Sequence, residues 1–114
     1  MKLRRHHVYV VDFNPRIKTK PGKVRPAIVV QDDLLSEAGY PSTIVVPTTT
    51  KLADTNTPLR LRLPAGTAGL DHDSDALVAQ LIAVANESFR KELGVLPADL
   101  AKVLARKLRD VLNL

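Results

Sequence analysis

The cations near the start of this chain are the residues whose type and spacing most clearly suggest chemistry. Residues 1–25 hold eight lysines and arginines against one carboxylate, Asp12, whereas the whole 114-residue chain has a formal net charge of only +5. Three of these cations flank a Pro-Gly pair that predicts a loop, and they are Lys18, Lys20 and Lys23. A basic segment on a nearly neutral body is typical of a protein that binds a polyanion such as a nucleic acid. Charge alone is equally compatible with a solvated surface, so both interpretations stay open.

Other residue types common in enzyme sites do not form a pattern that would hold a metal. The chain has no cysteine, which excludes disulfides and thiolate-bound zinc. His6 and His7 are adjacent on an expected strand, where neighbouring side chains point to opposite faces. The run Asp71-His72-Asp73 precedes a serine and is typical of a turn. We therefore expect no metal and no other cofactor.

The chain predicts one domain without a targeting or membrane segment. Its 114 residues suffice for one hydrophobic core, and no repeat or linker divides residues 1–114. No stretch near the N-terminus resembles the apolar part of a secretory signal, and no apolar run reaches about 18 residues. We expect a cytoplasmic protein with no membrane partner.

Short β-strands are predicted along most of the chain. Runs rich in valine, isoleucine and aromatic residues, separated by prolines and polar turns, indicate strands. The expected ranges are 7–13, 25–31, 42–46, 58–64, 77–84 and 90–95. The fourth alternates leucine with Arg60 and Arg62, so we expect its leucines to be buried. Its arginines could contact RNA or a partner, but we expect them to be solvated. The apolar stretch 77–84 predicts a central strand, although periodicity alone allows a helix.

The C-terminal residues predict the clearest helix. Apolar residues recur at spacings of three and four and form one stripe: Leu100, Val103, Leu104, Leu108, Val111 and Leu112. Pro97 suits the first helical position, and residues 32–38 could form one further helical turn. Several short strands followed by a helix predict a mostly β fold, a small bent sheet or barrel with the C-terminal helix packed against it.

Three stretches of the chain, taken in order, resemble the MazF/PemK family of bacterial toxins. The first is Val-Val-Asp-Phe-Asn-Pro at residues 10–15, followed by Pro-Gly-Lys-Val-Arg-Pro-Ala-Ile-Val-Val-Gln at 21–31. The second is Ile-Val-Val-Pro-Thr-Thr at 44–49. The third is Gly-Leu at 69–70, followed by Asp-Ala-Leu-Val-Ala-Gln at 75–80 and its continuation to Leu96. Each motif alone is weak, but the set in this order and at this chain length is fairly specific.

The resemblance implies a fold, an activity and partners. The fold would be an SH3-like β-barrel with a few helices, assembled as a homodimer. The activity would be that of the toxin of a type II toxin–antitoxin system, a sequence-specific endoribonuclease that cuts single-stranded messenger RNA and so inhibits translation and growth. Members cut by metal-independent transesterification and leave a cyclic phosphate. The resemblance also implies an acidic antitoxin with a segment that is disordered when free.

Two catalytic residues are implied by the resemblance, Arg25 and Thr48. The family's Arg-Pro motif matches Arg25-Pro26, and the threonine after the proline of the third strand matches Thr48. When a 2′-hydroxyl attacks the neighbouring phosphate, an arginine fork can bind the oxygens that gain negative charge. A threonine hydroxyl can donate to one of these oxygens or orient the attacking group. Because arginine is an awkward general acid and threonine a poor base, we assign Arg25 to charge stabilisation.

The third stretch departs from the family pattern. Many members have Asp-Gln followed shortly by Arg, whereas this chain has Ala79-Gln80 and then Ile82. One branch of the family is thought to use that Asp as the base and an Arg two residues before it as the acid, but the corresponding residue here is Leu77. That version of the mechanism is therefore not open to this chain. The residues expected to contact RNA are Asn14, Lys18, Lys20, Lys23, Gln31 and Gln80.

Two other classes of function remain open at this stage. The first is a nucleic-acid-binding barrel without catalytic activity, because Ala79 and Ile82 are also what a degenerate enzyme would carry. The second is a protein-interaction module whose apolar groove serves only a partner. RNA cleavage would separate the enzyme from both, and salt-dependent RNA affinity would separate the two remaining classes.

Overall fold

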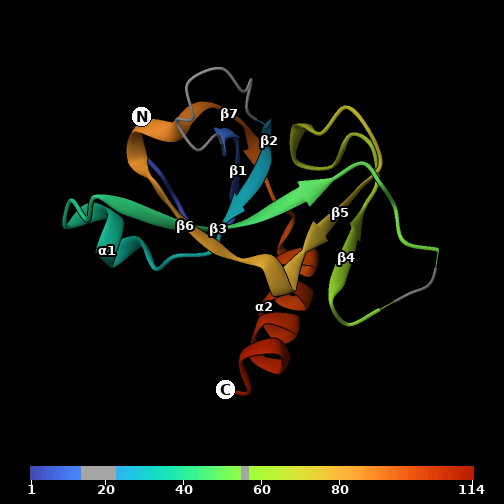
Figure 1. The fold of residues 1–114 in the computed structure, drawn as a ribbon. Coiled ribbons are helices and arrows are strands. Elements are labelled where there is room, and N and C mark those ends of the chain that lie inside the picture. Colours follow the sequence, from blue (N-terminus) through green and yellow to red (C-terminus); the bar gives the residue numbers. More distant parts are fainter. Residues whose placement is uncertain (14–22, 55–56) are drawn as a thin grey trace.

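A computed structural model describes residues 1–13, 23–54 and 57–114, which form a bent antiparallel sheet with a long helix against it (Figure 1). The strands are β1 (His7–Asp12), β2 (Val24–Val29), β3 (Ser42–Thr49), β4 (Arg60–Leu63), β5 (Ser74–Leu77), β6 (Ile82–Ala85) and β7 (Phe89–Val95). The helices are α1 (Asp33–Glu37) and α2 (Ala98–Leu112), and the short 3-10 turns are η1 (Thr67–Gly69), η2 (Val78–Gln80) and η3 (Asn86–Ser88).

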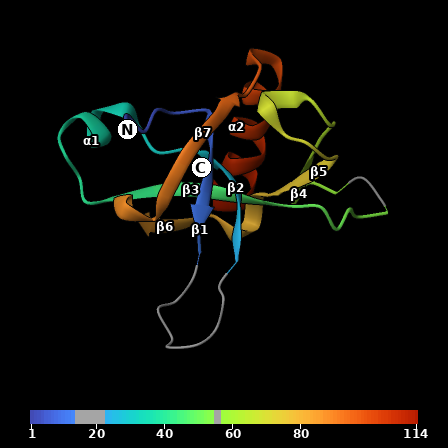
Figure 2. The same cartoon turned by 90° about the horizontal axis from the view of Figure 1, so that it is seen from above.

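The sheet is organised around β3. The strand order is β4-β5-β3-β2-β1-β7, and all of these neighbours are antiparallel. β6 pairs with the first half of β3, from Ser42 beside Ala85 to Val45 beside Ile82. β2 pairs with the middle of β3 and β5 with its end. The long β3 therefore crosses the molecule between two groups of strands (Figures 1 and 2).

The predicted strand over residues 42–46 is too short, because β3 continues through Pro47 to Thr49. A proline removes one backbone donor from a strand. Pro47 nevertheless lies opposite Ala27 of β2, and the two residues after it pair with β5. Pro47 therefore does not end the strand, and the extension carries Thr48 into the sheet.

The stretch 77–84 forms neither the single strand nor the helix that the sequence allowed. β5 ends at Leu77, the turn η2 follows, and β6 begins at Ile82. Both strands run antiparallel to β3, but β5 also pairs with β4 on its other side. Since β4 and β5 turn away from β1 and β2 (Figure 2), a straight strand could not follow both parts of the bent sheet.

The mostly β architecture with a C-terminal helix is confirmed, but a closed barrel is not. Within the described residues no pairing joins the edge strands β4 and β7, so the sheet is open. The concave side between the two groups of strands is filled by α2 (Figure 1). The expected SH3-like barrel is therefore better described as an open, strongly bent sheet whose concave side packs against α2.

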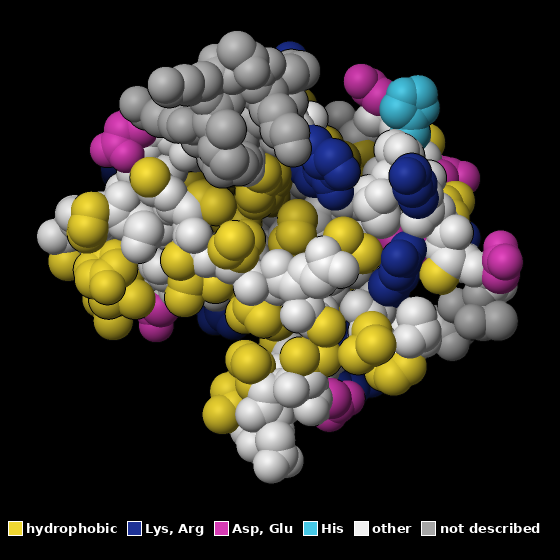
Figure 3. All heavy atoms as spheres, viewed as in Figure 1, with side chains coloured by type: hydrophobic (Ala, Val, Ile, Leu, Met, Phe, Trp, Pro, Cys, Tyr) yellow, Lys and Arg dark blue, Asp and Glu magenta, His cyan; other side chains and the backbone are white. Residues whose placement is uncertain are grey.

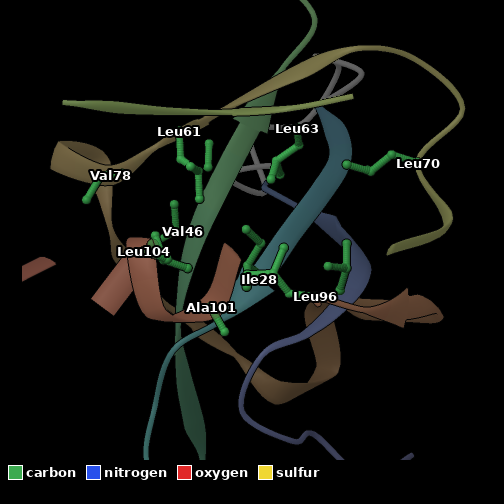
Figure 4. Packing of buried hydrophobic residues seen from close by; sticks show 11 residues of the cluster. Ile28, Val46, Leu61, Leu63, Leu70, Val78, Leu96, Ala101 and Leu104 are labelled. Carbon is green, nitrogen blue, oxygen red and sulfur yellow. The ribbon is translucent and has the colours of Figure 1, made fainter. Parts of the chain in front are cut away.

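The core lies between this helix and the sheet. Ala101 and Leu104 of α2 are buried in a cluster with Ile28 of β2 and Val46 of β3 (Figure 4), which confirms the predicted apolar stripe. The leucines of β4 point into the same cluster. The opposite face of the central strands holds a second cluster, made of Tyr9, Val11, Ala27, Val29, Val45 and Phe89. No helix in the described ranges has the length and apolar character needed to span a membrane.

Candidate active site

The pairing of β2 with β3 brings together the two residues implied to be catalytic. Thr48 Oγ1 donates a hydrogen bond to the backbone carbonyl of Pro26 at 2.8 Å. Arg25 Nη1 donates to the backbone carbonyl of Thr48 at 3.4 Å. Thr48 is almost fully buried, while Arg25 is partly exposed. The guanidinium therefore lies at the surface directly above the end of β3.

Thr48 is held from both sides because it lies where β3 passes between two neighbours. β2 lies on one side, and on the other side Thr48 pairs with Ala76 of β5. Its single hydroxyl proton is used in the bond to Pro26, so its oxygen is free in this arrangement to accept a hydrogen bond. The residue is thus suited to orient a donor such as a hydroxyl group.

Arg25 and Thr48 line a groove of about 740 Å³. Three lysines and a histidine line it with them: Lys23, Lys51, Lys91 and His72. Asp71 is the carboxylate among the described lining residues. Basic side chains gather on the face that carries the ends of β2 and β3 together with β4 and β5 (Figure 3). A groove with this charge and size suits an extended polyanion.

The lysines at positions 51 and 91 and His72 were not among the site residues expected from the sequence. Lys51 follows the threonines of β3 and Lys91 comes from β7, so both lie far in sequence from the basic N-terminal segment. The sequence indicates His72 only as part of a turn. Of these three residues, only Lys51 carries a sequence signal, because it directly follows the Pro-Thr-Thr-Thr run at residues 47–50.

Of the residues expected to contact RNA, the structure places Lys23 in the groove. Gln31 lies at the opposite end of β2 and is buried, with its amide nitrogen donating to the Ser42 carbonyl at 3.3 Å and its amide oxygen accepting from Ile44 N at 3.2 Å. Gln80 is exposed on η2 and does not line the groove. Asn14, Lys18 and Lys20 lie outside the described residues. A role of these five residues in RNA binding stays a prediction.

Arg62 is exposed, as expected, and Arg60 is partly exposed, but both arginines also bind the buried carboxylate of Asp75, which the sequence did not predict. Arg62 Nε lies 2.7 Å from Asp75 Oδ1, and Arg60 Nη1 lies 3.1 Å from Oδ2. Asp75 is only 2% exposed and also accepts from the Ala53 amide at 2.8 Å. Burial raises the pKa of Asp75, but the Ala53 amide and the two guanidinium groups outweigh this effect and hold the pKa below its ordinary value.

The same arginines also bind the segment that leads out of the groove. Arg60 Nη1 donates to the Lys51 carbonyl at 2.8 Å. Arg62 Nη2 donates to the Ala53 carbonyl at 2.8 Å. We call residues 49–53 the rim segment, since residues 49–51 line the groove. Asp75 thus ties β4, β5 and the rim segment together.

The opposite wall of the groove depends on two glycines. A Cβ at Gly94 of β7 would lie 2.7 Å from the backbone of Ala68, and one at Gly69 would collide with the Leu93 carbonyl. Gly69 also has a φ of +79°, which favours glycine. The turn η1 therefore packs directly on the backbone of β7, and this contact places the following residues, including His72, along the groove.

Comparisons with known proteins agree on one family. The family model described as "PemK-like, MazF-like toxin of type II toxin-antitoxin system" matches residues 4–112. Endoribonuclease MazF2 of Mycobacterium bovis is 30% identical over 114 residues, covering 100% of both chains. Endoribonuclease EndoA of Bacillus subtilis is 30% identical over 81 residues, covering 71% of this chain and 69% of that protein.

The fold is shared with solved structures at lower sequence identity. A MazE-MazF crystal structure (Form-II) from Deinococcus radiodurans has a TM-score of 0.81 at 22% identity, covering 100% of this chain and 98% of that one. An endoribonuclease in complex with its cognate antitoxin, from a mycobacterial species, has a TM-score of 0.77 at 14% identity, covering 97% and 95%. At these identities the likeness concerns the fold alone.

The Asp75 network predicts a specific loss of stability in acid. Asp75→Asn should lower the free energy of unfolding at neutral pH by about 1–3 kcal/mol, because the charged hydrogen bonds are lost while both arginines can still reach water. The carboxylate's contribution should be complete above about pH 4, the ordinary value for an unfolded aspartate. It should disappear as the pH falls from there through the lowered pKa of folded Asp75. Urea denaturation from pH 2 to pH 7 measures the difference between the two proteins.

Asp71→Asn is the matched control, since it neutralises an exposed carboxylate in the same region. Its unfolding free energy should stay within about 0.5 kcal/mol of wild type. A difference between wild type and Asp75→Asn that stays constant down to pH 2 would contradict the assigned role of the carboxylate.

Proposed function

The chain belongs to the family of PemK-like, MazF-like toxins of type II toxin–antitoxin systems, and we propose that it cuts single-stranded RNA in this groove by a transesterification that needs no metal. Endoribonuclease activity accords with relatives of that name, one of which matches over the full length of the chain. The observation that carries the proposed mechanism is the placement of Arg25 beside Thr48 in a basic groove. Because the proposed substrate is messenger RNA, we propose that the protein acts in the cytoplasm.

In the proposed reaction the RNA supplies its own nucleophile. The 2′-hydroxyl oxygen forms a bond to the adjacent phosphorus, and the bond from phosphorus to the 5′-oxygen of the next nucleotide breaks. The 2′-hydroxyl gives its proton to solvent water, and the departing 5′-oxygen takes a proton from solvent water. The products are a 2′,3′-cyclic phosphate and a 5′-hydroxyl. Negative charge gathers on the non-bridging oxygens in the transition state, where the Arg25 fork offers two donors in one plane. Arg25 is therefore proposed to stabilise this charge.

Thr48 is proposed to orient the attacking group. Because its own proton is directed to the Pro26 carbonyl, Oγ1 is suited to accept a hydrogen bond from the ribose 2′-hydroxyl. Of the two roles that the resemblance allowed, this one needs no change of hydroxyl rotamer. Ala79, at the position of the alternative base, is exposed outside the groove, and Leu77, at the position of the acid, is buried, so neither position supports the alternative acid–base pair. The alternative of a non-catalytic nucleic-acid-binding protein would use the same groove.

Single-stranded RNA fits the chemistry of the groove lining. Its lysines can follow the phosphates, and the partly exposed apolar side chains Val10 and Leu93 offer a surface for bases. Sequence-specific proteins usually recognise RNA whose bases are unstacked and free to pack on such surfaces. A duplex would keep its bases away from this lining.

We further propose an antitoxin partner and a homodimer. Two of the similar solved structures are described as complexes, one of MazE with MazF and one with a cognate antitoxin. An acidic segment that is disordered when free could place its carboxylates along the lysines of the groove and fold as it binds. Exposed Ile44 and Ile82 lie on the neighbouring strands β3 and β6, and such an apolar surface supports association with a second copy.

The proposed chemistry predicts RNA cleavage in the presence of EDTA. A single-stranded RNA should be cut into one fragment with a 5′-hydroxyl and another with a 2′,3′-cyclic or 3′-phosphate, as mass spectrometry of the products would show. After the cut site is mapped, the same oligonucleotide with 2′-deoxyribose at the scissile nucleotide should remain intact. A strict requirement for Mg²⁺, or a 5′-phosphate on the product, would refute the proposal.

If the antitoxin binds in the groove, one pair of charge reversals should weaken the binding of both RNA and antitoxin. Lys23→Glu with Lys91→Glu should reduce the affinity for RNA and for the antitoxin, and should flatten the dependence of RNA affinity on salt by at least about 1.4 in log–log slope. Titration of each ligand at several salt concentrations measures both effects. The control is Lys102→Glu with Arg106→Glu on the exposed face of α2. Unchanged antitoxin affinity in the groove variant would place that partner elsewhere.

A further inference from the structure

We propose that Asp75, acting through Arg60, is a positioning residue that holds Lys51 in place to bind an RNA phosphate next to the scissile one. The inference rests on the proposed endoribonuclease function and assigns residues outside the Arg25–Thr48 pair to substrate binding. Lys51 lines the groove with that pair, and the hydrogen bonds around its backbone carry the argument.

The rim segment continues directly from the catalytic strand. Thr48 is fixed between β2 and β5. Thr49 pairs with Asp75, and its Oγ1 accepts from the Lys51 amide at 3.1 Å. Lys51 therefore lies in a bend only three residues after Thr48, and it lines the same groove. A phosphate bound by Lys51 would belong to a nucleotide close to the cut.

Without further support this segment would be a mobile surface loop. Outside β3 it has no strand partner within the described residues, and Lys51 itself is exposed. The Lys51 carbonyl is held by Arg60, while the carbonyl and amide of Ala53 are held by Arg62 and Asp75. Charge-assisted bonds of this kind fix a backbone more firmly than neutral ones.

The buried carboxylate sets the direction of both arginines. The guanidinium group is planar, so when Asp75 binds some of its N–H groups, the remaining N–H groups point in defined directions. Arg60 uses the same Nη1 for Asp75 Oδ2 and the Lys51 carbonyl. If the carboxylate were absent, Arg60 would be free to turn into solvent, because about a third of its side chain is exposed. The Lys51 ammonium would then sample many positions, and binding a phosphate would cost more conformational entropy.

The test uses Arg60→Met, because this variant leaves Asp75 bound by Arg62 and the Ala53 amide. Steady-state cleavage of a mapped RNA should show KM raised roughly three- to tenfold with kcat changed less than twofold, since Lys51 holds a flanking phosphate. Binding of the same RNA with 2′-deoxyribose at the scissile nucleotide should weaken by the same factor. The salt slope of binding should fall by up to about 0.7, the value for one phosphate contact on a single strand.

A double-mutant cycle with Lys51→Met separates positioning from a direct contact. If Arg60 acts through Lys51, Arg60→Met should change neither KM nor the salt slope further in the Lys51→Met background. Asp75→Asn should behave like Arg60→Met in both backgrounds, judged at a temperature where all proteins are folded. Arg106→Met on α2 is the control for the loss of one surface arginine, and it should match wild type.

Two outcomes would overturn the inference. The first is that the effects of Arg60→Met and Lys51→Met are additive, which would mean that Arg60 contacts RNA directly. The second is that Arg60→Met lowers thermal stability but leaves KM and RNA binding unchanged, which would mean that the network has a structural role only. The proposed function fails separately. If the wild-type protein binds the uncleavable oligonucleotide but cuts no RNA, the proposed endoribonuclease activity is refuted. The double-mutant cycle, measured by RNA affinity, would still decide the role of the rim segment. A wild-type protein that binds no RNA would overturn both.

Discussion

The antiparallel register between β2 and β3 is the constraint on which the groove depends. Backbone pairing sets Ala27 opposite Pro47, and this makes Arg25 and Thr48 neighbours before any side chain contributes. A shift by one residue would reverse the two faces of β3, which would take Val46 out of one hydrophobic cluster and Val45 out of the other. Packing on both sides of one strand therefore enforces the geometry of the site.

The two walls of the groove are attached to this strand pair by different interactions. On one side a buried carboxylate with two arginines holds the rim segment. On the other side the turn η1 lies against the bare backbone of Gly94. Among the residues that the structure describes, no further strand closes either wall, as expected for an open sheet. An open sheet leaves the end of β3 accessible, whereas a barrel closed over this end would cover it.

The sequence predicted the features that depend on local pattern or on recognisable motifs. Alternation indicated β4, spacing of three and four indicated α2, and the family motifs named Arg25 and Thr48. It did not predict the break between β5 and β6, because that break arises where β5 pairs with the end of β3 and β6 pairs with its first half. It also missed the Asp75 network, since an Arg-x-Arg strand shows no partner until residues more than ten positions away are paired with it.

The rate of the chemical step in variants of Arg25 tests the central claim most directly. Single-turnover cleavage at saturating enzyme should be slower for Arg25→Ala by about two to three powers of ten, with circular dichroism and RNA affinity close to those of wild type. Arg25→Lys should recover only part of the rate, because an ammonium lacks the planar fork. A wild-type rate in Arg25→Ala would contradict the account and would mean that the phosphate is stabilised by another group in the groove.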